Sequence, residues 1–278
     1  MSCIRFRLLP LALVALSFSS FGQTQAFDTQ LTRDGVTLNY QDARGTLAAP
    51  QRKRVIDTFF FAYLRERADF HPAAPSMVRI VIDPAYTGIA FVGDKDQAAT
   101  ITINPGWLAQ HPNDIDLVTH EAMHIVQGYP GYGDARVPGW LVEGIADYAR
   151  DRYGMDNAAA GWALPGKVEK GQNVDSGYRV TGAFLKWADA EHPGLVLALD
   201  KALRDGRYAP ALWQKHTGKA LPALWAQYAK PRSDAPPPAP ARQAALTGWS
   251  TGYRGDWVES TVSRLPLIQP PKTPRFAR

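Results

Sequence analysis

Two histidines four residues apart, His120 and His124, constrain the fold more than any other feature of this sequence. They lie in the run THEAMHIVQG, whose apolar spacing otherwise predicts an amphipathic helix. Positions four apart on a helix share one face and are separated by about 6 Å along the axis, so both imidazoles can reach a single ion. Glu121 then stands beside the place of a bound water and can take its proton. The spacing predicts a zinc-binding helix with Glu121 as general base.

A second helix is predicted to supply the third metal ligand. The run VPGWLVEGIADYARDRYG begins with a proline, ends with a glycine and carries Glu143, with 18 residues between His124 and this carboxylate. The neighbours of Glu143 are apolar, and a buried carboxylate without a partner is unfavourable, whereas a metal ion provides one. Asp147 lies one turn later on the same face. We predict that it accepts the second ring N–H of a ligand histidine, His120 in preference to His124.

The start of the chain predicts export. Arg5 and Arg7 precede an apolar run and a small-residue stretch that ends at Ala26, which is the pattern of a secretory signal peptide over residues 1–26. The apolar run is too short to span a bilayer, and no later segment offers about 18 uninterrupted apolar residues, so no transmembrane segment is expected. We therefore expect a secreted or periplasmic protein.

Cysteine and charge content narrow the chemistry of the mature chain. Cys3 is the only cysteine and lies in the signal peptide, so a zinc site must use histidine and carboxylate ligands. Removing Arg5 and Arg7 lowers the formal net charge from +5 to +3, and the remaining basic residues are scattered among acidic ones. This pattern argues against nucleic-acid binding.

The hydrophobic patterns predict an α+β domain over residues 27–230. Helical spacing extends over 50–68, while VRIVID and ATITIN, at 78–83 and 99–104, alternate as strands do. The pattern then becomes helical, with helices expected at about 113–127, 140–153, 177–191, 194–204 and 219–229. Strands that precede a helical half are typical of α+β folds.

The end of the chain is predicted to lie outside this domain. Residues 231–241 contain five prolines, which remove backbone donors and fix φ, so we expect a linker that neither helix nor sheet enters. The tail over 242–278 contains Trp249, Tyr253 and Trp257. Its further prolines favour a loosely docked or disordered extension.

Several motifs along the chain are shared with a known family. The specific ones are HEAMHIVQ and EGIADY, with VRIVID, ITINPGWL and DSGYRVTGAFLKWAD in support. From about Gly45 to Lys230 the sequence thereby resembles the gluzincin metallopeptidases and, more widely, the basic secretory protein family of plants and bacteria. The resemblance implies a zincin-like fold, one Zn²⁺ per chain and hydrolysis of peptide or protein substrates. Residues 231–278 lie outside it.

Tyr178 is the candidate for a second catalytic group. The resemblance implies a phenol or imidazole that donates a hydrogen bond to the oxyanion from a segment after the glutamate helix. Tyr178 begins a predicted helix after the Asp-Ser-Gly run at 175–177, which can cap and turn the chain so that a first-turn side chain faces a cleft. Tyr148 and Tyr153 are alternative donors.

Three functions fit these features. The leading one is a secreted zinc endopeptidase. An aminopeptidase shares the 18-residue gap, but the sequence has no Gly-x-Met-Glu-Asn segment to bind a substrate amino terminus. A noncatalytic secreted binding or defence protein with a structural zinc site is the third, although such a site does not need Glu121. If the strand at 99–104 lies at a sheet edge, an extended substrate can pair with it.

Overall fold

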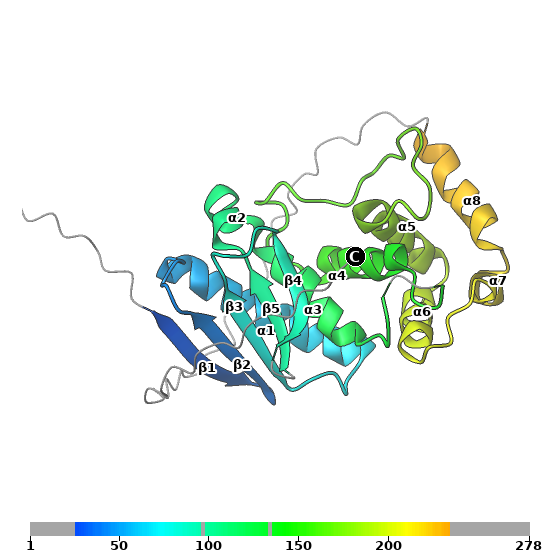
Figure 1. The fold of residues 1–278 in the computed structure, drawn as a ribbon. Helices are drawn as coiled ribbons and strands as arrows, with labels where there is room; N and C mark the ends of the chain where they lie inside the picture. The colour runs from blue at the N-terminus through cyan, green and yellow to red at the C-terminus, as the bar shows by residue number, and fades with distance from the viewer. Residues whose placement is uncertain (1–25, 96–97, 133–134, 234–278) are drawn as a thin grey trace, which may run out of the picture.

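The computed structural model describes residues 26–95, 98–132 and 135–233. Within these ranges a sheet is followed along the chain by a helical half, which is the predicted α+β arrangement (Figure 1). The predicted signal peptide up to residue 25, and residues 234–278 with most of the predicted linker and the whole tail, lie outside the described residues. None of the described helices is long and apolar enough to cross a lipid bilayer.

The sheet has five strands in the order β1-β2-β3-β5-β4. Strands β2, β3 and β5 run parallel, while β1 and β4 pair antiparallel at the two edges. The bounds are β1 (Phe27–Arg33), β2 (Val36–Asp42), β3 (Met77–Ile82), β4 (Ala90–Lys95) and β5 (Ala98–Ile103). Asp34 and Gly35 join β1 to β2 with φ of 46° and 76°, as a two-residue Asp-Gly hairpin requires.

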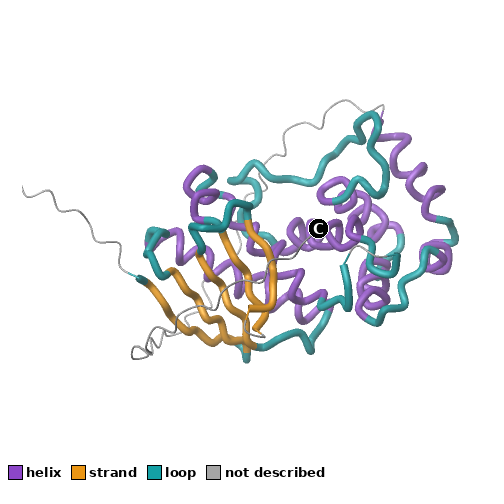
Figure 2. Tube along the Cα trace, viewed as in Figure 1, coloured by secondary structure: helices purple, strands orange, loops and turns teal. Residues whose placement is uncertain are grey.

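Helix α1 (Ala49–Phe70) lies against one face of the sheet (Figures 1 and 2). Its buried residues belong to the same hydrophobic core as those of the strands. The four apolar positions that predict this helix, Val55, Phe59, Ala62 and Tyr63, are all fully buried. On β2 every second side chain is buried, so the strand has one core face. The sheet and α1 together support the helix that carries the two histidines, since α3 packs on α1 and lies beside β4 and β5.

The helical half contains the predicted helices with small shifts of their ends. The described elements are α2 (Pro105–Gln110), the 3₁₀ turn η1 (Asp114–Asp116), α3 (Leu117–Gln127), α4 (Gly139–Tyr153), α5 (Tyr178–Glu191), α6 (Leu195–Arg204), α7 (Ala211–Thr217) and α8 (Leu221–Ser233). The first residues of the predicted helix at 113–127 form η1, and α2 and α7 are short helices that the sequence patterns did not predict.

One expectation about an element end is wrong. Helix α8 continues through Pro231 to Ser233, because a proline in the last turn removes only one helical hydrogen bond. The guanidinium of Arg232 also donates to the carbonyl of Tyr228 at 2.8 Å, which satisfies an acceptor in this turn. The structure also decides a point that the sequence left open. The strand at 99–104 is internal, because β5 lies between β3 and β4, and β4 occupies the edge.

Candidate metal centre

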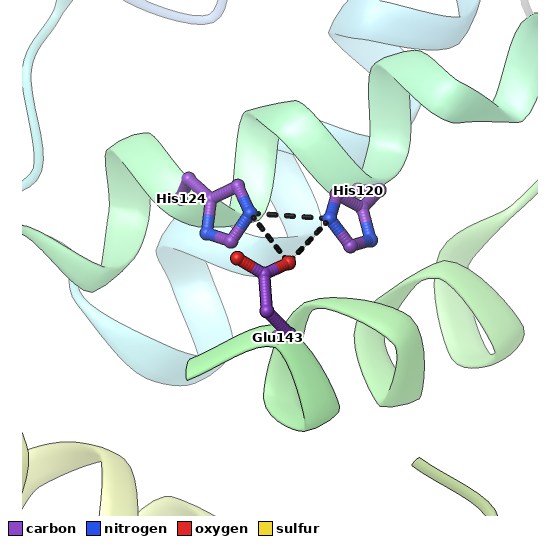
Figure 3. Close-up of side chains that lie close together, drawn as sticks. All are labelled: His120, His124 and Glu143. Carbon is purple, nitrogen blue, oxygen red and sulfur yellow. Dashed lines mark hydrogen bonds and ion pairs between the residues drawn. The ribbon is translucent and has the colours of Figure 1, made fainter. Parts of the chain in front are cut away.

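Helix α3 places the two histidines of the HExxH run side by side. The Nε2 atoms of His120 and His124 lie 3.1 Å apart, and the two rings are nearly perpendicular with centroids separated by 4.8 Å. The helix ends at Gly128, whose φ of 50° is the left-handed conformation that commonly terminates helices. One turn of helix therefore directs two ring nitrogens toward one point, as the close-up in Figure 3 shows.

Glu143 approaches this point from α4, on the opposite side (Figure 3). Its Oε2 atom lies 3.2 Å from Nε2 of His120 and 3.5 Å from Nε2 of His124. One ligand atom from each of the three residues falls within 4.8 Å of the other two. The structure thus brings together the three predicted metal ligands, which come from two helices that pack against each other.

A close helix crossing explains the glycine that follows Glu143. A Cβ atom added to Gly144 would lie 2.2 Å from Cγ2 of Thr181 on α5, so α4 and α5 approach too closely for any side chain at this position. Thr181 is fully buried, and its hydroxyl donates to the carbonyl of Val174 at 2.7 Å. The crossing brings the first residue of α5, Tyr178, to the cleft above the histidines.

Each histidine is held through its second ring nitrogen. Nδ1 of His120 lies 2.7 Å from Oδ1 of Asp147, the pair that the sequence predicts. Nδ1 of His124 lies 2.8 Å from Oε1 of Gln127, whose amide nitrogen donates to the carbonyl of Val142 at 2.9 Å. With a proton on each Nδ1, both Nε2 atoms keep a lone pair for a metal.

Gln127 is a site residue that the sequence analysis missed. The run HEAMHIVQ contains the pattern that could have identified it, because Gln127 is a polar residue one turn after His124 and follows the buried Ile125 and Val126. Gln127 itself is 2% exposed. A buried amide needs partners for both its carbonyl and its NH₂ group. Here one partner is a predicted metal ligand and the other is the residue before Glu143.

Carboxylates surround the two histidines. Burial lowers the pKa of His120, but its hydrogen bonds with Asp147 and Glu143 outweigh burial and raise that pKa to about 10. Burial raises the pKa of Glu143, but its hydrogen bonds with both histidines hold that pKa well below the ordinary range. Positive charge is therefore favoured at this point between the carboxylates, and a divalent cation is one way to supply it. Two imidazoles and a carboxylate are donors that suit zinc.

Glu121 lines the same cleft from α3. Glu121 is only 8% exposed. Burial raises the pKa of this carboxyl, against the lowering effect of His120 and His124. A carboxyl with a raised pKa takes up a proton more readily than an exposed one, which is the property that a general base and acid needs.

Of the three tyrosines considered as oxyanion donors, only Tyr178 lines the cleft. The hydroxyls of Tyr148 and Tyr153 donate instead to Asp189 and Asp69. The ring of Tyr178 lies parallel to that of His120, with centroids 6.3 Å apart, and its side chain is exposed. Its φ of 42° is an unfavourable conformation for an aromatic residue, and such strain is concentrated at functional sites.

Tyr132 is a second site residue that the sequence analysis missed. It lies in the connection between α3 and α4, which the sequence identified only as rich in turns. Its hydroxyl donates to Oε1 of Glu143 at 2.7 Å. Burial and the neighbouring Glu143 raise the pKa of this phenol, so the hydroxyl stays protonated and remains a donor.

These residues line one large cleft with a volume of about 1370 Å³. Ile89 and Phe91, at the start of β4, contribute exposed apolar side chains to it. Further along, Trp107 and Trp162 line the cleft beside Arg150, whose guanidinium lies over the ring of Trp162 at 4.4 Å. The lining of the cleft thus combines the charged and polar groups around the histidines with apolar and aromatic side chains.

The chain matches solved structures of M1 zinc metallopeptidases. The chain matches a two-domain M1 zinc metallopeptidase mutant bound to L-tryptophan with 17% identity and a TM-score of 0.47, over 77% of this chain and 54% of that one. It also matches the M1 zinc metallopeptidase from Deinococcus radiodurans with 19% identity and a TM-score of 0.44, over 78% of this chain and 53% of that one. The chain therefore spans about half the length of the structures it matches.

The family comparison is more specific. No curated protein matches the chain significantly. In contrast, the profile of the BSP family, described as "Peptidase of plants and bacteria", matches residues 37–228. This range includes β2 except for its first residue, every later strand and all the predicted site residues. The match covers more than half of the chain. The protein is a member of the BSP family of peptidases of plants and bacteria.

Proposed function

We propose that this peptidase is a zinc-dependent endopeptidase whose metal is held by His120, His124 and Glu143. The observation that carries the proposal is the convergence of these three ligand atoms within 4.8 Å in an open cleft that Glu121 also lines. A zinc ion bound there would supply Lewis acidity to water and to the scissile carbonyl. We further propose that the mature protein is secreted or periplasmic, on the basis of residues 1–26 alone.

Glu121 would move the protons of the reaction. Its carboxylate would accept a proton as water attacks the scissile carbonyl, and the same carboxyl would then donate that proton to the departing amine. The raised pKa that burial gives to Glu121 favours both steps, since the group must hold the proton between them. A structural zinc site needs no such residue, which argues against a noncatalytic binding protein.

Tyr178 would stabilise the oxyanion of the tetrahedral intermediate. Its phenol is exposed to the cleft, and its ring lies over His120. The positive φ of Tyr178 is a strained conformation, which supports a functional reason for the direction of its side chain. A donor aimed at developing negative charge typically contributes about 100- to 1000-fold to turnover.

The cleft favours internal peptide bonds over amino-terminal ones. An aminopeptidase must pair the α-ammonium group of its substrate with acidic side chains. Among the described residues that line the cleft, Asp114 is bound to Arg150 at 2.5 Å and to the indole N–H of Trp107 at 2.8 Å. Glu143 and Asp147 contact the histidines, and Glu121 is the proposed general base. Each acidic residue that lines the described cleft therefore has another role than binding an α-ammonium group.

Two substitutions test the proposal by separating catalysis from metal binding. We expect Glu121→Gln to keep one zinc ion per chain and to lose peptide hydrolysis, and His124→Ala to lose zinc and to melt at a lower temperature. Zinc would be quantified on the purified mature protein, and cleavage profiled by mass spectrometry on a diverse peptide library. Cleavage within peptides supports an endopeptidase, and release of single amino-terminal residues supports an aminopeptidase. An inert wild-type protein that binds zinc would instead support the binding-protein alternative.

A further inference from the structure

The two carboxylate oxygens of Glu143 have different partners. Oε2 lies 3.2 Å and 3.5 Å from the Nε2 atoms of His120 and His124, at the point where the three proposed ligands converge. Oε1 instead accepts a hydrogen bond of 2.7 Å from the hydroxyl of Tyr132. Oε2 thus faces the proposed metal position, while Oε1 is hydrogen-bonded to the phenol of Tyr132.

Tyr132 contributes little to the core of the protein. The residue is 65% exposed, the largest exposed fraction among the large hydrophobic residues in the described part of the chain. Its ring rests against the first residue of α4, because a Cβ atom added to Gly139 would lie 3.5 Å from three ring and hydroxyl atoms. Tyr132 thus contacts the start of the helix that carries Glu143, and its hydroxyl points at that carboxylate. A side chain that is so exposed has little role in packing.

We propose that Tyr132 is a positioning residue that restricts Glu143 to a single ligating oxygen. A carboxylate can bind a metal through one oxygen or through both. The hydrogen bond to Tyr132 stabilises the orientation in which Oε1 points away from the histidines. Catalytic zinc sites keep a coordination position open for water or substrate, and a second oxygen from Glu143 would fill that position. This inference rests on the metal site of the proposed function.

The assignment separates the roles of two tyrosines in one cleft. The ring of Tyr178 lies parallel to that of His120, and no described residue forms a hydrogen bond with its hydroxyl. Tyr132 instead donates to Glu143, a proposed metal ligand. Loss of the Tyr132 hydroxyl should therefore change the metal site itself. Loss of the Tyr178 hydroxyl should leave the metal site unchanged, which makes Tyr178→Phe a matched control for metal binding.

The test compares Tyr132→Phe with wild type and with Tyr178→Phe in three measurements. Thermal melting of the metal-free proteins reports folding, and all three should melt alike. Competition with a chelator gives zinc affinity, and we expect a 10- to 100-fold loss in Tyr132→Phe alone, the usual effect of removing a group that holds a ligand. Visible spectra of the cobalt(II)-substituted proteins report coordination, and absorption should weaken in Tyr132→Phe alone as Glu143 gains its second bond.

Each outcome identifies which claim fails. If wild type binds zinc and Tyr132→Phe shows wild-type affinity and a wild-type cobalt spectrum, the positioning role is wrong and the proposed function stands. If the affinity and the spectrum change equally in both tyrosine variants, the effect is not specific to the hydrogen bond with Glu143, and the role is also wrong. If the wild-type protein binds no zinc, both this inference and the proposed metal site on which it rests are wrong.

Discussion

The side-chain carbonyl of Gln127 lies 2.8 Å from Nδ1 of His124, so the last residue of α3 holds a ligand on its own helix. The amide nitrogen of the same side chain donates to the carbonyl of Val142 on α4 at 2.9 Å. One buried amide therefore sets the tautomer of His124 and joins the histidine helix to the helix of Glu143. The same side chain thus contacts both helices that carry the three proposed ligands.

We predict that Gln127→Met weakens zinc binding by about 10- to 100-fold, because His124 loses the group that orients its ring. The free energy of unfolding of the metal-free protein should fall by about 1–3 kcal/mol, since the carbonyl of the buried Val142 loses its donor. Zinc titration against a chelator and urea unfolding measure the two effects. Gln110→Met on α2, where the side chain is exposed, is the control and should change neither. Wild-type zinc affinity in Gln127→Met would show that the amide has no role in ligation.

Local patterns predicted the ligand helices because their chemistry is encoded by spacing along one chain segment. The pair His120 and His124 needs only helical periodicity to share a face. Asp147 follows Glu143 by one turn, so its position beside His120 also follows from periodicity once the two helices pack. Gln127 obeys the same rule, because it follows His124 by three residues on the same helix.

Other features depend on tertiary contacts that a local pattern does not contain. Strand β4 contains Gly93 and weak alternation, and it is a strand because it pairs with β5. Tyr132 reaches Glu143 through a turn-rich connection whose path spacing does not define. The hairpin of β1 and β2, in contrast, carries a readable signal in Asp34 and Gly35 between alternating residues, which the sequence analysis did not use.

A buried carboxyl on α1 predicts that stability depends on pH. Glu66 is fully buried, and neither of its oxygens has a hydrogen-bond partner among the described residues. Burial raises its pKa well above the ordinary value of 4.5, against a lowering effect of His120. Above that ordinary value the folded protein binds more protons than the unfolded chain. The contribution of Glu66 to stability is therefore complete below about pH 4.5 and is lost as pH rises through the folded pKa.

Glu66→Gln should remove this loss, because a glutamine does not ionise. We expect the variant to be more stable than wild type at pH 8, with a flatter dependence of unfolding free energy on pH between 5 and 8. The Glu66 contribution in wild type is limited to about 1.4 kcal/mol per pH unit. Urea unfolding of the metal-free proteins across this range measures it, with the exposed Glu169→Gln as control. Parallel curves for wild type and Glu66→Gln would mean that Glu66 is ionised in the folded protein.

The proposed oxyanion donor gives a kinetic prediction. Tyr178→Phe should fold, keep zinc and show little change in KM, but lose about 100- to 1000-fold in kcat, because the missing hydroxyl acts on charge that develops only in the transition state. Tyr153→Phe is the control, since the hydroxyl of Tyr153 donates to Asp69 away from the cleft. Steady-state kinetics on one peptide substrate measure both variants. Near-normal turnover in zinc-loaded Tyr178→Phe would remove this residue from the mechanism.

The edge of the sheet predicts how a substrate lies in the cleft. Strand β4, not β5, ends the strand order, and residues 89–92 at its start line the cleft with the histidines. An extended peptide can add to this edge through backbone hydrogen bonds, which would place its scissile carbonyl near His120 and His124. Along a strand, every second residue directs its N–H to a given neighbour.

N-methylation of a substrate peptide tests this pairing one residue at a time. We expect kcat/KM to fall by a few-fold to about 10-fold at alternate positions around the scissile bond, the effect of losing one hydrogen bond, with smaller changes at the positions between them. The period of two is the discriminating feature. A methyl group that acts only through its bulk would lower cleavage most at the scissile bond and less with distance on either side. Equal cleavage of all the methylated peptides, or a decline with distance that shows no alternation, would count against strand pairing on β4.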